Sequence, residues 1–137
     1  MDAVPADSTT RLQAEVQALL RALDADHRRV AADEWGLSVE CSGWPLHIGL
    51  AVRGGLLRVQ AEVLGPGRLA PEKLLHRNRL GVLVRFAHTR AGAVWLQGEL
   101  PAAAVDATEL DRLLGVLMEA ASWARQAAAE DPASPPA

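Results

Sequence analysis

The segment from Gly81 to Leu100 constrains the fold of this chain more than any other. Apolar and polar residues alternate on both sides of a turn at Thr89–Gly92, which is the period of two expected for strands with one buried face. The segment therefore predicts a β-hairpin, and Pro101–Val105 joins it to the longest helix in the sequence. The residues expected to point inward are Val82, Val84, Phe86, Val94, Leu96, Gly98 and Leu100.

Three further strands are predicted upstream of this hairpin. They follow from alternation in Leu37–Cys41, Leu46–Val52 and Leu57–Val63, separated by turn signals at residues 42–45 and 53–55. The charged segment Asp24–Glu34 has no such pattern, and we expect it to be a frayed helix end and a loop.

Three amphipathic helices complete the predicted domain. They are expected at Ser8–Leu23, Pro71–Arg79 and Asp106–Ala129, and Asp106 with Glu109 fits a capping box at the start of the last one. The order α-β-β-β-α-β-β-α predicts an α+β fold of two layers. We expect a mainly antiparallel five-stranded sheet with the helices on one face.

Composition indicates one domain in a reducing compartment. We place the domain at residues 8–130, between a flexible N-terminus (1–7) and a disordered tail (131–137). Cys41 is the only cysteine, so an internal disulfide is excluded. The first ten residues lack the basic and apolar regions of a signal peptide, and no apolar run is long enough to cross a membrane. We therefore expect a cytoplasmic protein, and the abundance of Arg, Ala and Gly is typical of a high-GC bacterial genome.

No residue pattern in the sequence predicts a catalytic or metal site. The four histidines are dispersed without ligand spacing, and Cys41 lies inside a strand alternation, where a buried apolar role is the ordinary one. No serine stands in a nucleophile elbow. We expect no catalytic residue, no metal and no cofactor, and we predict that the protein is not an enzyme.

A basic cluster supports an alternative function. Lys73, His76, Arg77 and Arg79 fall on the short central helix and could contact the phosphates of a nucleic acid. The net charge of −3 and the lack of aromatic residues in the cluster favour a solvated helix face instead. Direct nucleic-acid binding is therefore kept as the second interpretation.

Two sets of residues are candidates for a protein-binding or dimer surface. The first is a second apolar edge on the last helix, formed by Val116, Ala120 and Trp123. A wide helical layer or a tail folded over the edge is the alternative, and an interface is favoured for Trp123 with Val116. The second set is the outward face of the hairpin, which mixes an aromatic with polar groups: Leu83, Arg85, Trp95 and Gln97. For Trp95 the two explanations are level.

Two consecutive runs carry a resemblance to a known family. They are KLLHRNRLGVLVRFAHTRAGAVWLQGELP and VDATELDRLLGVLMEAASWA, within residues 73–130. These runs resemble the YbjN family, whose fold is similar to that of type III secretion chaperones. The matching points are Asn78, Gly92, Leu100-Pro101 and Glu109-Leu110, whereas Arg79-Leu80 departs from the pattern. The strands at residues 37–64 agree with the family only in number and order.

The resemblance implies a small non-enzymatic protein, commonly dimeric, that binds another protein. Secretion chaperones of this fold wrap an extended client segment. Our leading hypothesis is a homodimeric, chaperone-like or adaptor protein with an unidentified protein partner and a role in a stress response. The alternative is a nucleic-acid-associated protein that uses the basic helix, or an adaptor for a nucleic-acid-processing protein.

Overall fold

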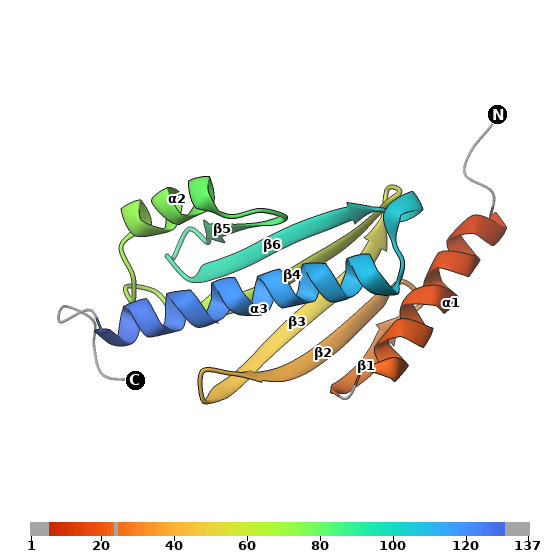
Figure 1. Ribbon diagram of the computed structural model, residues 1–137, viewed down its shortest axis with the longest axis horizontal. Coiled ribbons are helices and arrows are strands. Elements are labelled where there is room, and N and C mark those ends of the chain that lie inside the picture. The colour runs from red at the N-terminus through yellow and green to blue at the C-terminus, as the bar shows by residue number, and fades with distance from the viewer. Residues whose placement is uncertain (1–5, 24, 131–137) are drawn as a thin grey trace.

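Six antiparallel strands form a single sheet in the computed structural model, which describes residues 6–23 and 25–130 (Figure 1). The strand order is β1-β2-β3-β4-β6-β5. The strands are β1 (Asp26–Ala31), β2 (Glu34–Cys41), β3 (Trp44–Arg53), β4 (Leu56–Leu64), β5 (Val84–His88) and β6 (Val94–Pro101). The helices are α1 (Ala6–Ala22), α2 (Pro71–Leu80) and α3 (Ala107–Glu130), with a 3-10 turn η1 (Ala102–Ala104) before α3.

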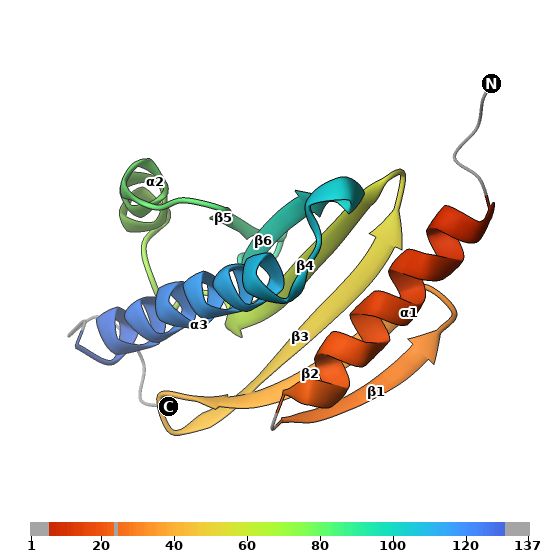
Figure 2. The same cartoon turned by 45° about the vertical axis from the view of Figure 1, so that its right-hand side comes forward.

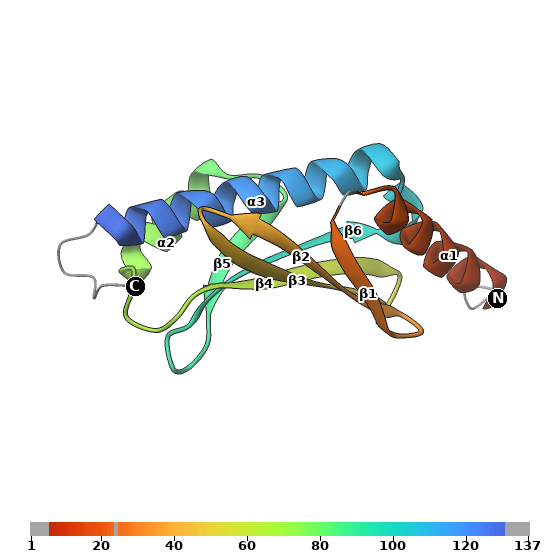
Figure 3. The same cartoon turned by 90° about the horizontal axis from the view of Figure 1, so that it is seen from below.

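The helices cover one face of the sheet, as the two-layer α+β prediction requires. Figure 3 shows α1 and α3 above the same face, and Figure 2 shows α1 over the β1 side of the sheet and α3 over the β4–β6 side. Helix α2 packs beside the edge strand β5. In the part of the chain described, no helix is long and apolar enough to cross a membrane. The expected flexible end and tail fall mainly on residues 1–5 and 131–137, which lie outside the described residues, and α1 already begins at Ala6.

Strand β1 corrects the prediction of five strands. The segment expected to be a loop pairs with β2 along the sheet edge, where Asp26 lies opposite Ser38 and Arg28 opposite Gly36. Charged side chains are common on edge strands because they discourage further pairing, and here they replaced the apolar alternation on which strand prediction depends. Even the helix-facing side is polar: the Arg29 guanidinium lies 5.3 Å from the centre of the Trp35 ring.

Trp35 belongs to the core, although its position was assigned to no strand. Strand β2 begins one residue before it, and only 1% of Trp35 is exposed. Its indole Nε1 donates a hydrogen bond to Gln17 Oε1 of α1 at 3.0 Å. Trp35 therefore joins the first helix to the sheet.

The hairpin predicted at Gly81–Leu100 is present, but its first strand begins only at Val84. Leu83 has φ of 67°, a conformation that costs a bulky residue steric strain, and the amide of Val84 donates to Val82 O at 2.7 Å. Val82 is 65% exposed, so the prediction that it points inward was wrong. The bend also lies close to β6 at Gly98, where an added Cβ would be only 2.8 Å from Leu83 O.

Asn78 closes the outer edge of β5. Its side-chain Nδ2 donates to Phe86 O at 3.1 Å, and its Oδ1 accepts from the Phe86 amide at 2.7 Å. The carboxamide thus occupies the backbone donor and acceptor that a neighbouring strand would use. This contact explains structurally why an asparagine stands at the end of α2.

The last helix confirms its predicted stripe and adds a buried charge. Leu110, Leu113, Leu114, Leu117, Ala121 and Ala124 are all buried, and Asp106 Oδ1 accepts from the Glu109 amide at 2.8 Å, as the expected cap requires.

Arg125, on the same helix, was not singled out from the sequence. It is 5% exposed and donates to four backbone carbonyls. They are Val63 O at 3.1 Å, Cys41 O at 2.8 Å, Trp44 O at 3.1 Å and Pro45 O at 3.0 Å. Its guanidinium also lies 3.5 Å from the centre of the Trp44 ring, and burial lowers the pKa of Arg125. We call this contact the Arg125 clamp; it ties the β2–β3 turn and the end of β4 to α3.

Candidate functional site

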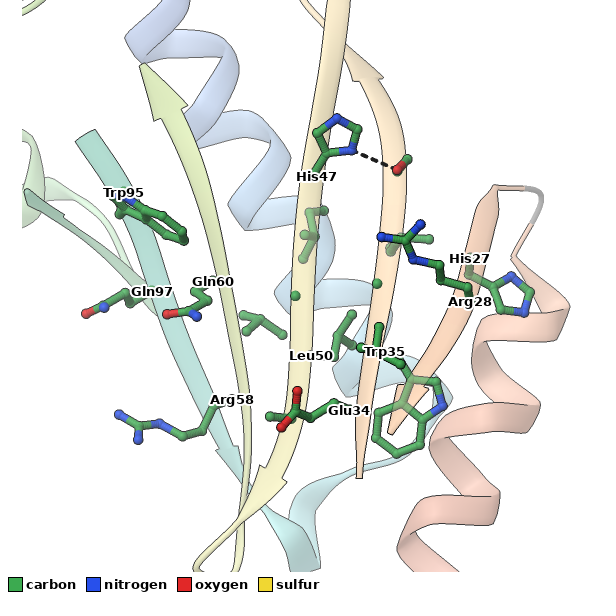
Figure 4. A pocket seen from close by; sticks show the side chains of 18 of the residues that line it. His27, Arg28, Glu34, Trp35, His47, Leu50, Arg58, Gln60, Trp95 and Gln97 are labelled. Carbon is green, nitrogen blue, oxygen red and sulfur yellow. Dashed lines mark hydrogen bonds between the residues drawn. The ribbon is translucent and has the colours of Figure 1, made fainter. Parts of the chain in front are cut away.

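The face of the sheet opposite α1 and α3 is hollowed into a trough of about 870 Å³, which we call the open-face trough (Figure 4). Strands β1, β2, β3, β4 and β6 all contribute to its lining. The alternation of each strand sends its apolar residues toward the helices and its polar residues into this trough.

One row of residues in register crosses the floor of the trough from edge to edge. Each neighbour pairs directly with the next across the strand order, and the row is Arg28, Gly36, Gly49, Gln60, Gln97 and Arg85. Two adjacent glycines in the middle of the row expose bare backbone. The long side chains on either side of them form the walls.

Polar contacts border the floor. On β2 and β3, Ser38 Oγ lies 2.9 Å from His47 Nδ1 at one end, as the dashed line in Figure 4 marks. At the other end, Arg53 forms an ion pair with Glu34 at 2.5 Å. Both partners of that pair are substantially exposed, so the pair adds little stability.

The trough holds two arginines that are not paired with an acid of the described chain. Glu34 is paired with Arg53, and Glu99 is held by both terminal nitrogens of Arg85 at 3.0 and 3.4 Å. Arg28 and Arg58, which line opposite sides, make no ion pair or hydrogen bond with any residue that the structure describes.

Three of the four residues predicted on the outward face of the hairpin lie together on the open face. Arg85 pairs with Gln97 in register, and Trp95 lies two residues before Gln97 on β6, so it points to the same face. The indole Nε1 of Trp95 is buried and has no hydrogen-bond partner within the described residues. Leu83 lies outside β5, in the strained bend before it.

The sequence prediction missed the half of the trough built by β1 to β4. The outward positions of His47, Gly49, Arg58 and Gln60 follow from the alternation of their strands. Their alignment with the hairpin depends on strand order and register, which alternation alone does not define. Arg28 had no usable signal because its strand was interpreted as a loop.

The predicted apolar edge of α3 is half-buried within the molecule. The ring of Trp123 packs against Phe86 with centroids 5.7 Å apart and an interplanar angle of 52°. The guanidinium of Arg77 lies 4.9 Å from the centre of the same ring. Val116 and Ala120 are likewise half-exposed on this helix. These contacts give the edge an intramolecular role at the junction of α2, β5 and α3, and its role in binding stays a prediction.

The predicted basic helix is α2. Lys73, His76 and Arg79 are exposed, whereas Arg77 is half-buried over Trp123. The cluster therefore keeps three of its four candidate side chains in solvent, and nucleic-acid contact by it stays a prediction.

Exposed apolar side chains concentrate at the end of α2. Of the six large hydrophobic residues that are exposed within the described chain, four fall in residues 75–83: Leu75, Leu80, Val82 and Leu83. We call these four residues the α2–β5 apolar patch.

Titratable groups show no metal-binding arrangement in the described ranges. No group of three or more His, Cys, Asp or Glu side chains is placed to hold a metal ion there. Cys41 is buried, and its Sγ lies 3.7 Å from Met118 O.

Comparison with known proteins identifies the fold. No protein-family model matches the sequence, and no curated protein matches it. Among solved structures, the HopA1–SchA chaperone–effector complex matches with a TM-score of 0.65 and 14% identity, over 90% of this chain and 97% of the other. The ExsC–ExsE complex matches with a TM-score of 0.57 and 21% identity, over 91% and 96% of the two chains.

A third solved structure is the Yersinia pestis type III secretion chaperone SycH in complex with a fragment of YscM2. It matches with a TM-score of 0.55 and 17% identity, over 82% of this chain and 96% of the other. At these identities the likeness establishes the fold: the chain has the α+β fold of type III secretion chaperones.

Proposed function

We propose that this protein is a non-enzymatic, chaperone-like adaptor that forms a homodimer in the cytoplasm and binds a partner protein. The observation that carries the proposal is the shared fold, because SycH and the HopA1–SchA pair were both solved as chaperones in complex with a second protein. The resemblance to the YbjN family, carried by points such as Asn78, is the basis for proposing a general or stress-related role.

The α2–β5 apolar patch supports the homodimer. Leu80 is 66% exposed and Val82 is 65% exposed, and side chains of this size are usually covered when they cluster on a surface. A second copy related by a two-fold axis covers the same patch on both subunits at once. We therefore place the dimer contact at this edge of the sheet.

Light scattering coupled to gel filtration tests the dimer. We expect a dimer at tens of micromolar and a monomer after Leu80→Asp combined with Val82→Asp. The matched control is Val30→Asp, which adds an acid at a 60% exposed valine on the opposite edge strand and should leave the dimer intact. A wild-type protein that is strictly monomeric contradicts the homodimer.

Partner binding is tested by reconstitution. Proteins captured from the native cell extract would be identified by mass spectrometry, produced separately and mixed with the purified chain. The proposal expects at least one of them to form a complex of defined stoichiometry that survives gel filtration. If none does so, the adaptor function is rejected.

A further inference from the structure

We propose that the open-face trough binds an acidic segment of the partner protein, with Arg28 and Arg58 as the residues that recognise its carboxylates. The inference rests on the proposed function, because it assigns the place and the chemistry of partner binding. It concerns a face of the molecule separate from the α2–β5 apolar patch, so the two can fail independently.

Charge is the first support. Two of the three acids that line the trough, Glu34 and Glu99, are neutralised by their own arginines. Asp26, at the start of β1, is the third and has no ion pair in the described chain. Arg28 and Arg58 remain as two guanidinium groups without a carboxylate or other partner among the described residues. The lining holds three arginines and three acids, whereas the chain as a whole carries −3, and two of the three lining guanidinium groups are left unpaired within the described ranges.

The spacing of the walls is the second support. Arg28 stands on β1 and Arg58 on β4, with β2 and β3 between them. Three strand spacings amount to about 14 Å, which accommodates one peptide segment and lets long arginine side chains reach it from both sides. Figure 4 shows the Arg28 side chain extending from β1 over β2, whereas the Arg58 side chain extends from β4 toward β6 and would rotate toward β3 to contact the same segment. A carboxylate in the trough would form charge-assisted hydrogen bonds with either guanidinium.

The bare floor is the third support. Neither Gly36 nor Gly49 has the positive φ that requires glycine, and an added Cβ would meet its nearest atom only at 3.8 and 3.9 Å, respectively. Larger, β-branched residues would suit these strand positions better. Glycine inside a strand often marks a place where another backbone approaches closely. An occupant of the trough accounts for both glycines, whereas folding accounts for neither.

A nucleic acid is the competing anionic occupant. Binding of a phosphate chain depends on many cations, because each neutralised phosphate adds to the affinity through released counterions. Two free guanidinium groups beside the carboxamides of Gln60 and Gln97 suit a short run of carboxylates and peptide groups better.

Fluorescence polarisation with labelled synthetic peptides tests the proposal. The probes are a short peptide of alternating Glu and Ala, its Lys-Ala counterpart and a short oligothymidylate, at a salt concentration of about 20 mM to limit screening. We expect the Glu-Ala peptide to bind at least about tenfold more tightly than the other two probes. The double variant Arg28→Glu with Arg58→Glu should weaken its binding at least about tenfold.

Two further variants separate the trough from the rest of the surface. Gly49→Val fills the floor and should abolish peptide binding while the protein stays folded. Arg112→Glu on α3 introduces the charge change of one such substitution outside the trough lining and should leave binding unchanged. In a spectrum of the backbone and indole amides, the Trp95 indole signal should shift on peptide addition, and the Trp123 signal should not.

The trough proposal is overturned if all three probes bind equally, if Gly49→Val binds the peptide as well as the wild type, or if oligothymidylate is preferred. A shift at Trp123 alone would also overturn it, because acid binding would then belong to the neighbourhood of α2. Light scattering on the same samples reports the dimer separately. If the protein is a dimer but does not bind the acidic peptide, the trough proposal is rejected and the proposed function is retained.

Discussion

Replacement of Arg125 by methionine removes five buried N–H donors while keeping much of the side-chain volume. Four backbone carbonyls lose a charged donor, and the contacts to Val63 O and Cys41 O are the buried ones. Leaving a buried acceptor unsatisfied costs about 1–3 kcal/mol, so these two carbonyls account for roughly 2–6 kcal/mol. The carbonyls of Trp44 and Pro45 are only partly buried and can turn to water.

Removal of the charge offsets part of this loss, since a buried guanidinium is itself costly to desolvate. We therefore expect Arg125→Met to lower the free energy of unfolding by about 3 kcal/mol, which places it among the large single-site effects. In a domain of this size the midpoint of thermal unfolding should fall by roughly 10 °C.

Urea unfolding followed by circular dichroism measures this change. Arg112→Met on the same helix is the matched control, because Arg112 is exposed and only approaches Glu109 at 3.9 Å. The control should change stability by less than about 0.5 kcal/mol. If Arg125→Met costs less than about 1 kcal/mol, water reaches the four carbonyls readily and the Arg125 clamp does not hold the turn.

Three other changes are predicted from close contacts. Gly98→Ala should lower the free energy of unfolding by about 1–3 kcal/mol, because its Cβ would meet a backbone oxygen at 2.8 Å. The control Gly49→Ala, on the open face of the sheet, should be neutral or slightly stabilising, and chemical denaturation compares the two variants. Asn78→Ala should speed hydrogen exchange at the Phe86 amide and cost about 1–2 kcal/mol, and exchange as slow as in the wild type would refute this. Trp35→Phe keeps one aromatic ring but loses the bond to α1 and part of the buried volume, so unfolding should become easier by about 2 kcal/mol, measured by denaturation against the wild type.

The fold was largely predictable because most of its elements carry one clear period. The buried stripe of α3 repeats at helical spacing from Leu110 to Ala124, and the two tight turns place Ser42-Gly43 and Gly54-Gly55 at the positive φ that such hairpins require. Strand β1 escaped prediction because it lies at an edge. Pairing with β2 stabilises its strand conformation, and its side chains show no alternation of apolar and polar residues.

The candidate site was less predictable, and the reason is register. Trp95 and Gln97 could be placed on an outward face from their own strand, but the row that joins Gln97 to Gly49 and Arg28 exists only once four pairings are known. Arg125 escaped for a different reason. An arginine near the end of a helix is ordinarily solvated, and its carbonyl partners are 62 to 84 residues away in the sequence.

The Arg125 clamp also has a consequence for the response of the protein to its medium. It holds its charge with carbonyl dipoles and the face of Trp44, so it contains no carboxylate that acid could protonate. Because burial lowers the pKa of Arg125, the unfolded chain binds more protons wherever this group titrates, so its titration makes stability rise with pH. Dissolved salt screens exposed pairs such as Arg53–Glu34 but reaches a buried charge poorly. The β2–β3 end of the sheet should therefore stay anchored in acid and in brine, while the electrostatics of the open face follow the ionic strength around it.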